Sequence, residues 1–268
     1  MLALIAGQGR LPALVYERLQ AEGQAPLVAE LDGFKAGTPV SADITFRLET
    51  LGGFFDDLAA RGVTQVAFAG RIRRPMLDPE RVDRRTKQMF ATISSALRDG
   101  DDGALRTILN LFADAGFEIV ALPQIMPDLL PPPGAAAKIK PDRDDDEEAR
   151  IGMRVIAAMG AADVGQACVV AMGTVIAVEA APGTDWMLET LTKRPDDLPP
   201  GGLLIKAAKP GQDRRADLPT IGPGTIRAAA AAGLTGVVIE AGSVLVIDPE
   251  EAVAEADRLG LFLWTRLS

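Results

Sequence analysis

The residues of this chain that are best suited to chemistry lie in one stretch, residues 206–222, with the sequence KAAKPGQDRRADLPTIG. Six charged residues fall within the first twelve positions of this polar segment: Lys206, Lys209, Asp213, Arg214, Arg215 and Asp217. Lysine and arginine bind phosphate oxygens, and carboxylates hold Mg²⁺ or position a water molecule. The polar segment therefore predicts a site for an anionic ligand that carries phosphate.

The arrangement of these charges depends on the local backbone. Two prolines and Gly211 prevent the polar segment from forming one regular helix. In an extended backbone alternate side chains share a face, so we expect Asp213, Arg215 and Asp217 to form one row. A purely structural ladder of salt bridges is the competing interpretation of that row.

The sequence contains no histidine. Nucleophiles activated by histidine, histidine-rich zinc sites and histidine-containing dinuclear phosphatase sites are therefore excluded. Acid–base or metal chemistry must come from carboxylates, lysine, arginine, hydroxyls or bound water. The single cysteine, Cys168, lies in the apolar run ACVVAMG and is interpreted as a small buried side chain. One thiol permits no intramolecular disulfide, which suits a reducing cytoplasm.

Length and composition indicate one large domain or two ordinary ones. The chain has 268 residues, of which 48% are hydrophobic but only 4% aromatic, so we expect a core without stacked rings. A net charge of −9 argues against a nucleic-acid partner. The apolar runs fall short of the ~20 residues of a spanning helix, and no cationic residue precedes the first apolar run as in a secretory signal. These features predict a cytoplasmic protein.

The first half of the chain alternates between strand and helix patterns. Strands are expected at residues 2–7, 25–31, 63–70 and 117–122, with helices at residues 11–21 and 52–61 and from residue 100 onward. Strands separated by helices imply a parallel sheet that is covered on both faces. This half is therefore predicted to form a Rossmann-like domain.

The composition changes at residues 127–150, where a proline-rich stretch precedes an acidic run. We therefore predict an α/β protein of two domains, residues 1–134 with the Rossmann-like parallel sheet and residues 135–268 with a smaller α/β fold. Strands are expected there at residues 166–171, 175–180, 203–206, 236–240 and 244–247, and helices at residues 147–159, 186–193, 225–232 and 249–259. The acidic run is interpreted as carboxylates that offset a helix macrodipole, and Asp248 as the cap of the last helix.

Two further segments follow predicted strands, where ligands bind in open α/β sheets. Gly7-Gln8-Gly9 could receive a phosphate on its backbone amides, although its spacing matches neither the dinucleotide fingerprint nor a Walker loop. A tight turn that needs small residues is the alternative. Arg71, with Arg73 and Arg74, could also meet phosphate, and a solvated loop is the alternative.

Three polar residues follow another predicted strand. Glu179 closes that strand, and Thr184 and Asp185 come just before the helix expected at residues 186–193. Each could line a cleft, but capping of the helix explains Thr184 and Asp185 more simply.

Several motifs together resemble those of the LpxI-type UDP-2,3-diacylglucosamine pyrophosphatases. The polar segment and the alanine-rich helix after it look like the signature of that family. The segments LIAGQGRLP, FAGRIRRP, GDDGALR and VIAVEAAPGTDWML fit the family in the same order, so the resemblance spans nearly the whole chain. One departure is Asp213, where the family can carry Glu, which makes Asp213 the less indispensable carboxylate.

The resemblance implies a step of lipid A biosynthesis, in which water cleaves the diphosphate of UDP-2,3-diacylglucosamine to give 2,3-diacylglucosamine 1-phosphate and UMP. It implies attack at the β-phosphorus, a requirement for Mg²⁺, and a catalytic C-terminal domain with the lipid product held between the domains. An acylated substrate further implies peripheral contact with the inner membrane surface, and a homodimer is left open.

The same resemblance and the motifs above assign the expected site residues. Asp217 is expected to be catalytic and, together with Asp213, to hold the metal ion. The expected substrate-binding residues are Gly7, Gly9, Arg10, Arg71, Thr184, Asp185, Lys206, Lys209, Gln212, Arg215, Thr220 and Gly222.

Two other classes of protein remain open from the residues. A non-catalytic nucleotide- or phospholipid-binding protein would use the Gly7-Gln8-Gly9 turn and the Arg215 region as its anion site. A Rossmann-type oxidoreductase is disfavoured, because Pro12 stands where the dinucleotide fingerprint has its third glycine.

Overall fold

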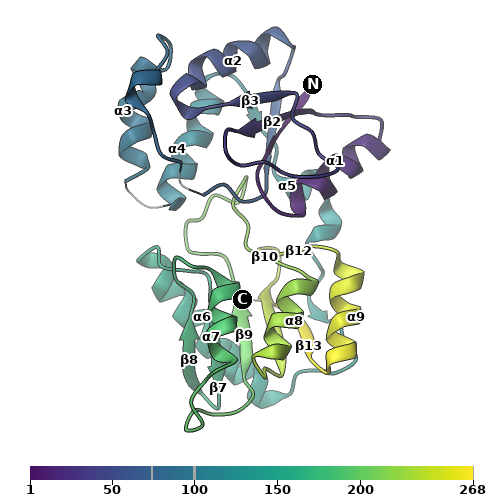
Figure 1. Ribbon diagram of the computed structural model, residues 1–268. Coiled ribbons are helices and arrows are strands. Elements are labelled where there is room, and N and C mark those ends of the chain that lie inside the picture. Colours follow the sequence, from purple (N-terminus) through teal and green to yellow (C-terminus); the bar gives the residue numbers. More distant parts are fainter. Residues whose placement is uncertain (74, 99–100, 268) are drawn as a thin grey trace. The chain divides into compact units, whose positions relative to one another are not determined.

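The computed structural model describes residues 1–73, 75–98 and 101–267, without the side chains of residues 101 and 102 (Figure 1). The contacts of the backbone divide the chain into two compact units. Unit 1 contains Met1–Pro127 together with Asp213–Asp217, and unit 2 contains Asp128–Gln212 and Leu218–Ser268. A short piece of the polar segment thus belongs by its contacts to the unit built from the N-terminal half.

Unit 1 is built on a parallel sheet of five strands in the order β3-β2-β1-β4-β5. These strands are β1 (Leu2–Ala6), β2 (Leu27–Leu31), β3 (Ile44–Phe46), β4 (Gln65–Ala69) and β5 (Glu118–Ile119). Each neighbouring pair runs parallel, and β2 is buried along its whole length. The predicted Rossmann-like parallel sheet is confirmed, and the strand order reverses between β1 and β4.

The helices of unit 1 lie between these strands along the chain, and one short helix follows the last strand. They are α1 (Leu11–Ala21), α2 (Leu51–Ala60), α3 (Lys87–Ala96), α4 (Asp101–Asp114) and α5 (Leu122–Ile125), with single 3₁₀ turns η1 (Leu48–Thr50) and η2 (Pro79–Arg81). The helix α3 and the short strand β3 were not predicted. The strand expected at residues 117–122 ends early, because Leu122 and the proline after it begin α5.

The core of unit 1 contradicts the expectation of a core without stacked rings. Phe46 stacks on Phe54 with ring centroids 4.1 Å apart, and Phe112 meets Phe55 edge-to-face at 4.9 Å. The rings of Phe68 and Phe117 also lie against Phe112. The prediction was wrong because a low overall aromatic content says nothing of where the rings are concentrated. Here they gather in one core, where aromatic pairs stabilise beyond their buried area.

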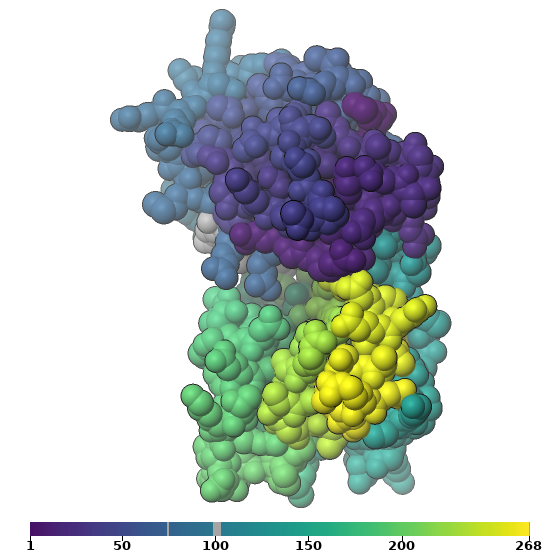
Figure 2. Space-filling view, turned by 45° about the vertical axis from the view of Figure 1, so that its right-hand side comes forward, coloured from purple at the N-terminus to yellow at the C-terminus, as the bar shows by residue number. Residues whose placement is uncertain are grey.

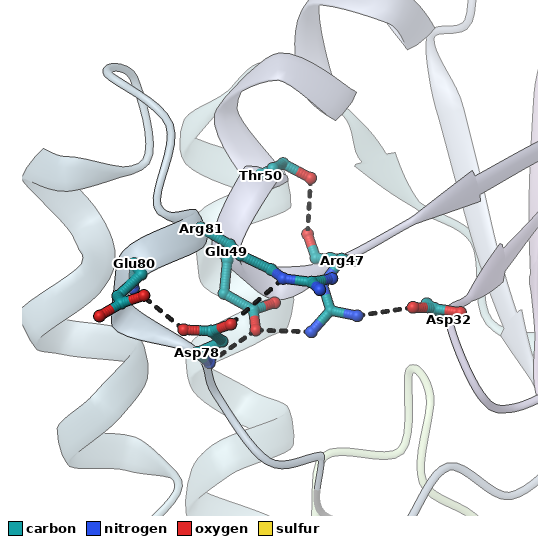
Figure 3. Close-up of polar contacts among 7 residues, drawn as sticks. All are labelled: Asp32, Arg47, Glu49, Thr50, Asp78, Glu80 and Arg81. Atoms are coloured by element: carbon teal, nitrogen blue, oxygen red, sulfur yellow. Dashed lines mark hydrogen bonds and ion pairs between the residues drawn. The ribbon is translucent and has the colours of Figure 1, made fainter.

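An ion-pair network ties the end of β2 to the chain near Asp78 (Figure 3). The guanidinium of Arg47 donates to Asp32 at 2.6 Å and to Glu49 at 2.9 Å, and Glu49 also accepts from the backbone N–H of Asp78 at 2.8 Å. Burial alone would raise the pKa of the Glu49 carboxyl, but these hydrogen bonds outweigh burial and lower it. Glu49 is therefore a structural charge, held by its partners.

The N-terminus of α2 is capped by residues distant in sequence. The Thr86 hydroxyl accepts from the N–H of Gly52 at 2.9 Å, and one Asp83 oxygen accepts from the N–H of Gly53 at 3.2 Å. The other Asp83 oxygen accepts from the N–H of Thr86 at 2.6 Å. A Cβ on Gly52 would lie 2.5 Å from the Cβ of Arg85, so glycine lets this loop approach the helix.

Unit 2 is built on a mixed sheet of six strands in the order β6-β13-β11-β9-β7-β8. The strands are β6 (Gly134–Ala135), β7 (Ala167–Ala171), β8 (Thr174–Val178), β9 (Leu203–Lys206), β11 (Gly236–Glu240) and β13 (Phe262–Arg266). The central strands β9, β11 and β13 run parallel, whereas β6, β7 and β8 join antiparallel at the two sides. A separate parallel pair contains β10 (Thr220–Ile221) and β12 (Leu245–Val246).

Helices cover both faces of this mixed sheet. The helix α6 (Arg143–Ala161) packs on one face, where Ala149 and Ile156 meet Cys168 and Ile205. The other face packs against α7 (Thr184–Leu191), α8 (Pro223–Ala231) and α9 (Pro249–Leu259). The helices α8 and α9 lie side by side at the surface, coloured yellow-green and yellow in Figure 2. The predicted α/β fold class is thus confirmed in both units.

Two predictions about helix ends have different outcomes. The acidic run does form a helix N-terminus, since Asp142 and Asp145 make a reciprocal capping box at the start of α6. This helix begins at Arg143, earlier than predicted. Asp248 is the N-cap residue of α9 as predicted, but its backbone is left-handed (φ 46°) and its side chain does not make the expected cap hydrogen bond.

The predicted environment of Cys168 is confirmed. The side chain is fully buried, and its thiol lies 3.6 Å from the carbonyl oxygen of Gly152. Burial raises the pKa of the Cys168 thiol to about 12, so the thiolate does not form near neutral pH. Cys168 therefore contributes packing, not reactivity.

The capping of α2 leads to a test of stability. Asp83→Ala should lower the free energy of unfolding by about 1–2 kcal/mol, because the amides of Gly53 and Thr86 lose their shared acceptor. Urea unfolding near neutral pH measures this difference. Asp57→Ala, an exposed change on the same helix, serves as the control and should shift stability by less than about 0.5 kcal/mol.

This effect should also depend on pH. Burial would raise the pKa of the Asp83 carboxyl, but its hydrogen bonds to Thr86 and Gly53 prevail and lower it from 3.8. A lowered folded-state pKa gives stabilisation that is present above pH 3.8 and lost as the pH falls through the folded-state value. The difference in the free energy of unfolding between wild type and Asp83→Ala should therefore become smaller below that pH. A difference that grows on acidification would contradict this role of Asp83.

Candidate functional site

In unit 1, the first candidate residues meet at the reversal of strand order. The turn after β1 and the turn after β4 form an isolated bridge, in which Gln8 and Arg71 exchange backbone hydrogen bonds of 2.9 and 2.8 Å. Gly7 also donates to the carbonyl oxygen of Ala69 at 2.8 Å. Four predicted residues, Gly7, Gly9, Arg10 and Arg71, are thus brought to the carboxyl ends of β1 and β4. Ligands commonly bind at such a reversal in open α/β sheets.

The glycines of these turns have local structural reasons. A Cβ on Gly7 would lie 2.7 Å from the carbonyl oxygen of Arg71, so only glycine allows the two turns to pair. Gly9 has a φ of 107°, in the region that favours glycine, with nothing close to its missing Cβ. Contact with a ligand at Gly7 and Gly9 stays a prediction beside this structural explanation.

The arginines of this region are mainly exposed. Arg10 forms an ion pair with Glu17 at 3.3 Å, with both side chains about half exposed. Arg71 and Arg73 are exposed as well. Arg74 and Gly100 lie outside the described residues, and so do the side chains of residues 101 and 102, which were expected at a helix start.

The middle of the polar segment forms a turn in unit 1. The N–H of Asp217 donates to the carbonyl oxygen of Asp213 at 3.0 Å, which closes one helical turn. Ala216 inside this turn packs against the apolar core of unit 1. The expected extended row was wrong, because the backbone turns after Asp213 and places the two aspartates four residues apart in one turn.

Within this turn, Arg215 donates several hydrogen bonds to the carboxylate of Asp213. The Arg215 Nε donates to Asp213 Oδ1 at 2.9 Å and Nη2 donates to Oδ2 at 2.6 Å, while the Arg215 N–H reaches Oδ1 at 3.1 Å. The hydrogen bonds from Arg215 are the main reason why the pKa of Asp213 is lowered, and the positive charge of Arg106 adds to them. The competing interpretation of these charges as a structural salt bridge therefore holds for the Asp213–Arg215 pair.

In unit 2, three buried polar side chains form a chain of hydrogen bonds. The Lys206 ammonium at the end of β9 donates to the Thr184 hydroxyl at 2.7 Å, and that hydroxyl donates to Glu179 Oε1 at 2.7 Å. The exposed fractions are 6% for Lys206 and 7% for Thr184 and Glu179. The second oxygen of Glu179 accepts from the N–H of Gln166 at 2.9 Å. We call these three residues the Lys206–Thr184–Glu179 relay.

The relay corrects the capping interpretation of Thr184 and Asp185. The N-cap of α7 is Gly183, without a cap hydrogen bond from a side chain, and Thr184 is the first helical residue. Its hydroxyl is used in the relay. Asp185 lies exposed in the first turn, where a negative charge suits the helix macrodipole.

A second polar group in unit 2 includes the predicted residues Lys209 and Gln212. The Gln212 side-chain oxygen accepts from the N–H of Lys209 at 2.9 Å, and its amide nitrogen donates to Gln166 at 3.2 Å. The Lys209 ammonium forms an ion pair with Asp163 at 2.6 Å. Because Gln166 also donates its N–H to Glu179, it links this group to the relay.

The last two predicted residues make local contacts. Thr220 lies in β10 and donates its hydroxyl to the carbonyl oxygen of Leu218 at 3.1 Å. Gly222 is the N-cap of α8, and its N–H donates to the Thr225 hydroxyl at 3.4 Å. These contacts position the start of α8 and neither support nor oppose substrate binding.

Sequence reasoning missed two polar residues near strand ends. Gln166 precedes β7, and Glu240 ends β11 and accepts from the N–H of Ala208 at 3.3 Å. Glu179, which follows β8, was considered as a residue that could line a cleft but was not included among the expected substrate-binding residues. A polar residue next to an apolar strand is the signal that had singled out Lys206 and Arg71, and this signal applied to every strand would have included all three.

The carboxylates set a limit on how a metal ion could be held. Among the described residues, no group of three or more Asp, Glu, His or Cys side chains is arranged to hold a metal ion. Proteins often bind Mg²⁺ through one or two carboxylates together with the phosphates of the substrate. The carboxylates of Asp217 and Asp213 lie on one helical turn and supply oxygen donors of the kind that Mg²⁺ prefers, and a Mg²⁺ bound there together with a phosphate-bearing ligand stays a prediction.

Within residues 1–73, 75–98 and 101–267, no helix combines the length and the apolar character needed to cross a membrane.

Comparisons with known proteins cover both units. The model of the LpxI N-terminal domain matches residues 1–129, and the model of the LpxI C-terminal domain matches residues 132–264. A relative from Caulobacter vibrioides, named UDP-2,3-diacylglucosamine pyrophosphatase LpxI, is 38% identical over 270 residues, which cover 98% of this chain and 96% of the relative. The resemblance drawn from the motifs is thereby confirmed, and the chain belongs to the LpxI family.

Proposed function

We propose that this protein hydrolyses the diphosphate of UDP-2,3-diacylglucosamine to 2,3-diacylglucosamine 1-phosphate and UMP, a step of lipid A biosynthesis. The observation that carries the proposal is family membership along nearly the whole chain, with a relative named for this activity. The structure adds support, because cationic side chains and carboxylates of the polar segment are held in defined contacts. Such groups suit a substrate whose reacting part is an anionic diphosphate.

The two aspartates of the Asp213–Asp217 turn take different roles in this proposal. Arg215 donates to both oxygens of Asp213, and the pKa of Asp213 is lowered, so Asp213 is a poor proton acceptor. We assign Asp213 to holding Arg215 in place. Asp217 matches the essential carboxylate of the family signature, and we assign to it the activation of water.

A magnesium ion bound with the substrate would be held by Asp217, with Asp213 as the second nearby carboxylate. When bound, Mg²⁺ would offset the negative charge that develops on the phosphate oxygens. The residues of the chain then have separate tasks. In unit 1, Arg71 and Arg215 are assigned to bind phosphate oxygens of the substrate, and in unit 2 the same role is assigned to Lys206.

In the proposed step, the oxygen of a water molecule bonds to the β-phosphorus and the bond from that phosphorus to the bridging oxygen breaks. Asp217 receives a proton of the water, and UMP leaves with the bridging oxygen. The second product is the sugar 1-phosphate. Because the substrate carries two acyl chains, we also propose that the protein makes peripheral contact with the inner membrane surface.

Product analysis tests the activity and the direction of attack together. Purified protein with UDP-2,3-diacylglucosamine and Mg²⁺ in ¹⁸O-water should release UMP without label and sugar 1-phosphate with one ¹⁸O. Label in UMP would move the attack to the α-phosphorus. Tight binding of the substrate without any release of UMP would instead favour a non-catalytic nucleotide- or phospholipid-binding protein.

Substitution of Asp217 tests its role. Asp217→Asn should lower kcat by about 100-fold or more and change KM little, because a residue that activates water acts mainly in the transition state. Circular dichroism and the melting temperature should stay close to those of the wild type. Asp213→Asn is the matched control, since it alters the other carboxylate of the same turn. It should lower kcat by less than Asp217→Asn does. A folded Asp217→Asn protein with near-normal kcat would remove Asp217 from the mechanism.

Removal of divalent cations tests the metal requirement. With only oxygen ligands available, the site suits Mg²⁺ or Mn²⁺, so EDTA should abolish UMP release and added Mg²⁺ should restore it. The protein should stay folded in EDTA, because the described carboxylates do not form a closed metal site that the fold would need. Full turnover in EDTA after exhaustive removal of carry-over metal would rule out a metal-assisted route.

A further inference from the structure

We infer that Glu179 is a positioning residue that acts through Thr184 to fix the ammonium of Lys206 for the anionic substrate. This inference rests on the proposed function, because it concerns how a phosphate-binding group of that reaction is held. Glu179 lies in unit 2 directly after β8, Thr184 begins α7, and Lys206 ends β9. Three elements of the same unit thus contribute one side chain each.

The chemistry of the three groups gives the relay one direction. An ammonium can only donate hydrogen bonds, and an ionised carboxylate can only accept them. The Thr184 hydroxyl between them must therefore accept from Lys206 and donate to Glu179, over two contacts of 2.7 Å each. Since a hydroxyl has a single proton, the acceptor on Glu179 decides where the lone pairs of Thr184 point, and the hydroxyl so oriented contributes to holding Lys206.

The position of Glu179 is itself fixed from several sides. Its second carboxylate oxygen accepts from the N–H of Gln166 at 2.9 Å, and its own N–H donates to the carbonyl oxygen of Ala167 at 2.8 Å. A Cβ on Gly165 would lie 2.4 Å from the carbonyl oxygen of Glu179, so glycine permits the close approach of these two segments. A carboxylate held in this way is a rigid anchor for the groups that bond to it.

Burial makes the anchor necessary. A polar group with an exposed fraction of only 6% or 7% loses most of its contact with water and needs hydrogen bonds from the protein. In a buried chain of hydrogen bonds each member polarises the next, so a change at one end is felt at the other. Glu179 can therefore influence Lys206 although a hydroxyl lies between their charges.

Glu179→Gln is the sharpest substitution, because it keeps size and shape. The introduced amide would offer one acceptor and one donor where two acceptors are needed, so either Thr184 or the N–H of Gln166 would lose its partner. A misplaced Lys206 should support ground-state binding better than the transition state. We therefore expect kcat for UMP release to fall about 10- to 100-fold with a small change of KM.

A double-mutant cycle with Lys206→Met separates positioning from general stability. If Glu179 acts through Lys206, Glu179→Gln should lower kcat in the wild-type background and change it less than about 2-fold in the Lys206→Met background. If the two single substitutions lower kcat by factors that multiply in the double variant, the inference is overturned. Glu189→Gln, an exposed change of the same type on α7, is the matched control and should leave both constants unaltered.

Thr184 provides an independent second test, which remains informative if Glu179→Gln does not fold. Thr184→Ser keeps the hydroxyl and should retain kcat within about 3-fold, whereas the isosteric Thr184→Val removes it and should lower kcat as Glu179→Gln does. Equal activity of these two variants would overturn the inference while leaving the proposed function intact. A wild-type protein that releases no UMP would instead overturn the proposed function, and this inference with it.

Discussion

The burial of a lysine ammonium at the end of β9 constrains much of the unit around it. Lys206 follows three apolar residues that are buried in the sheet, and its own exposed fraction is 6%. A buried cation is tolerated only where hydrogen-bond acceptors meet it. The start of α7 and the end of β8 meet this need, because they place Thr184 and Glu179 within reach. The packing of β8, β9 and α7 therefore also supplies the hydrogen-bond partners that the Lys206 ammonium needs.

The same dependence on partners explains why sequence reasoning succeeded in some places and failed in others. Strands such as β1, β9 and β11 were predicted because each is a continuous apolar run, and such a run is buried between covering layers. This signal lies in the run itself and does not depend on distant partners. Very short elements such as β3 and β6 carry too few residues for a pattern. Their pairing is decided by the neighbouring strand, which the local sequence does not reveal.

The side chains of the site show this limit most clearly. Thr184 before a helical pattern is a good cap by local statistics, but in the structure its hydroxyl bonds to residues that are 5 and 22 positions away. Lys206, Thr184, Lys209 and Gln212 were predicted to bind substrate. The structure shows hydrogen bonds between Lys206 and Thr184 and between Lys209 and Gln212, and contact of these residues with a substrate stays a prediction. The pairing of Gln212 with Gln166 and of Lys209 with Asp163 could not be predicted, since each pair is separated by 46 residues in sequence and only the fold brings the partners together.

The carboxylates of the Asp213–Asp217 turn show how partners can give two residues of the same type different roles. A guanidinium stays charged at any ordinary pH and matches a carboxylate with two parallel hydrogen bonds, so Arg215 keeps Asp213 ionised and fixed. A carboxylate whose pKa is lowered in this way takes up a proton less readily and serves better as an anchor. In the mechanism proposed for this chain without histidine, a carboxylate activates water, and the contacts with Arg215 make Asp213 less suited to that role. The proposed role of Asp217 rests on the motif that contains both aspartates, while the contacts with Arg215 give Asp213 its own proposed role as an anchor.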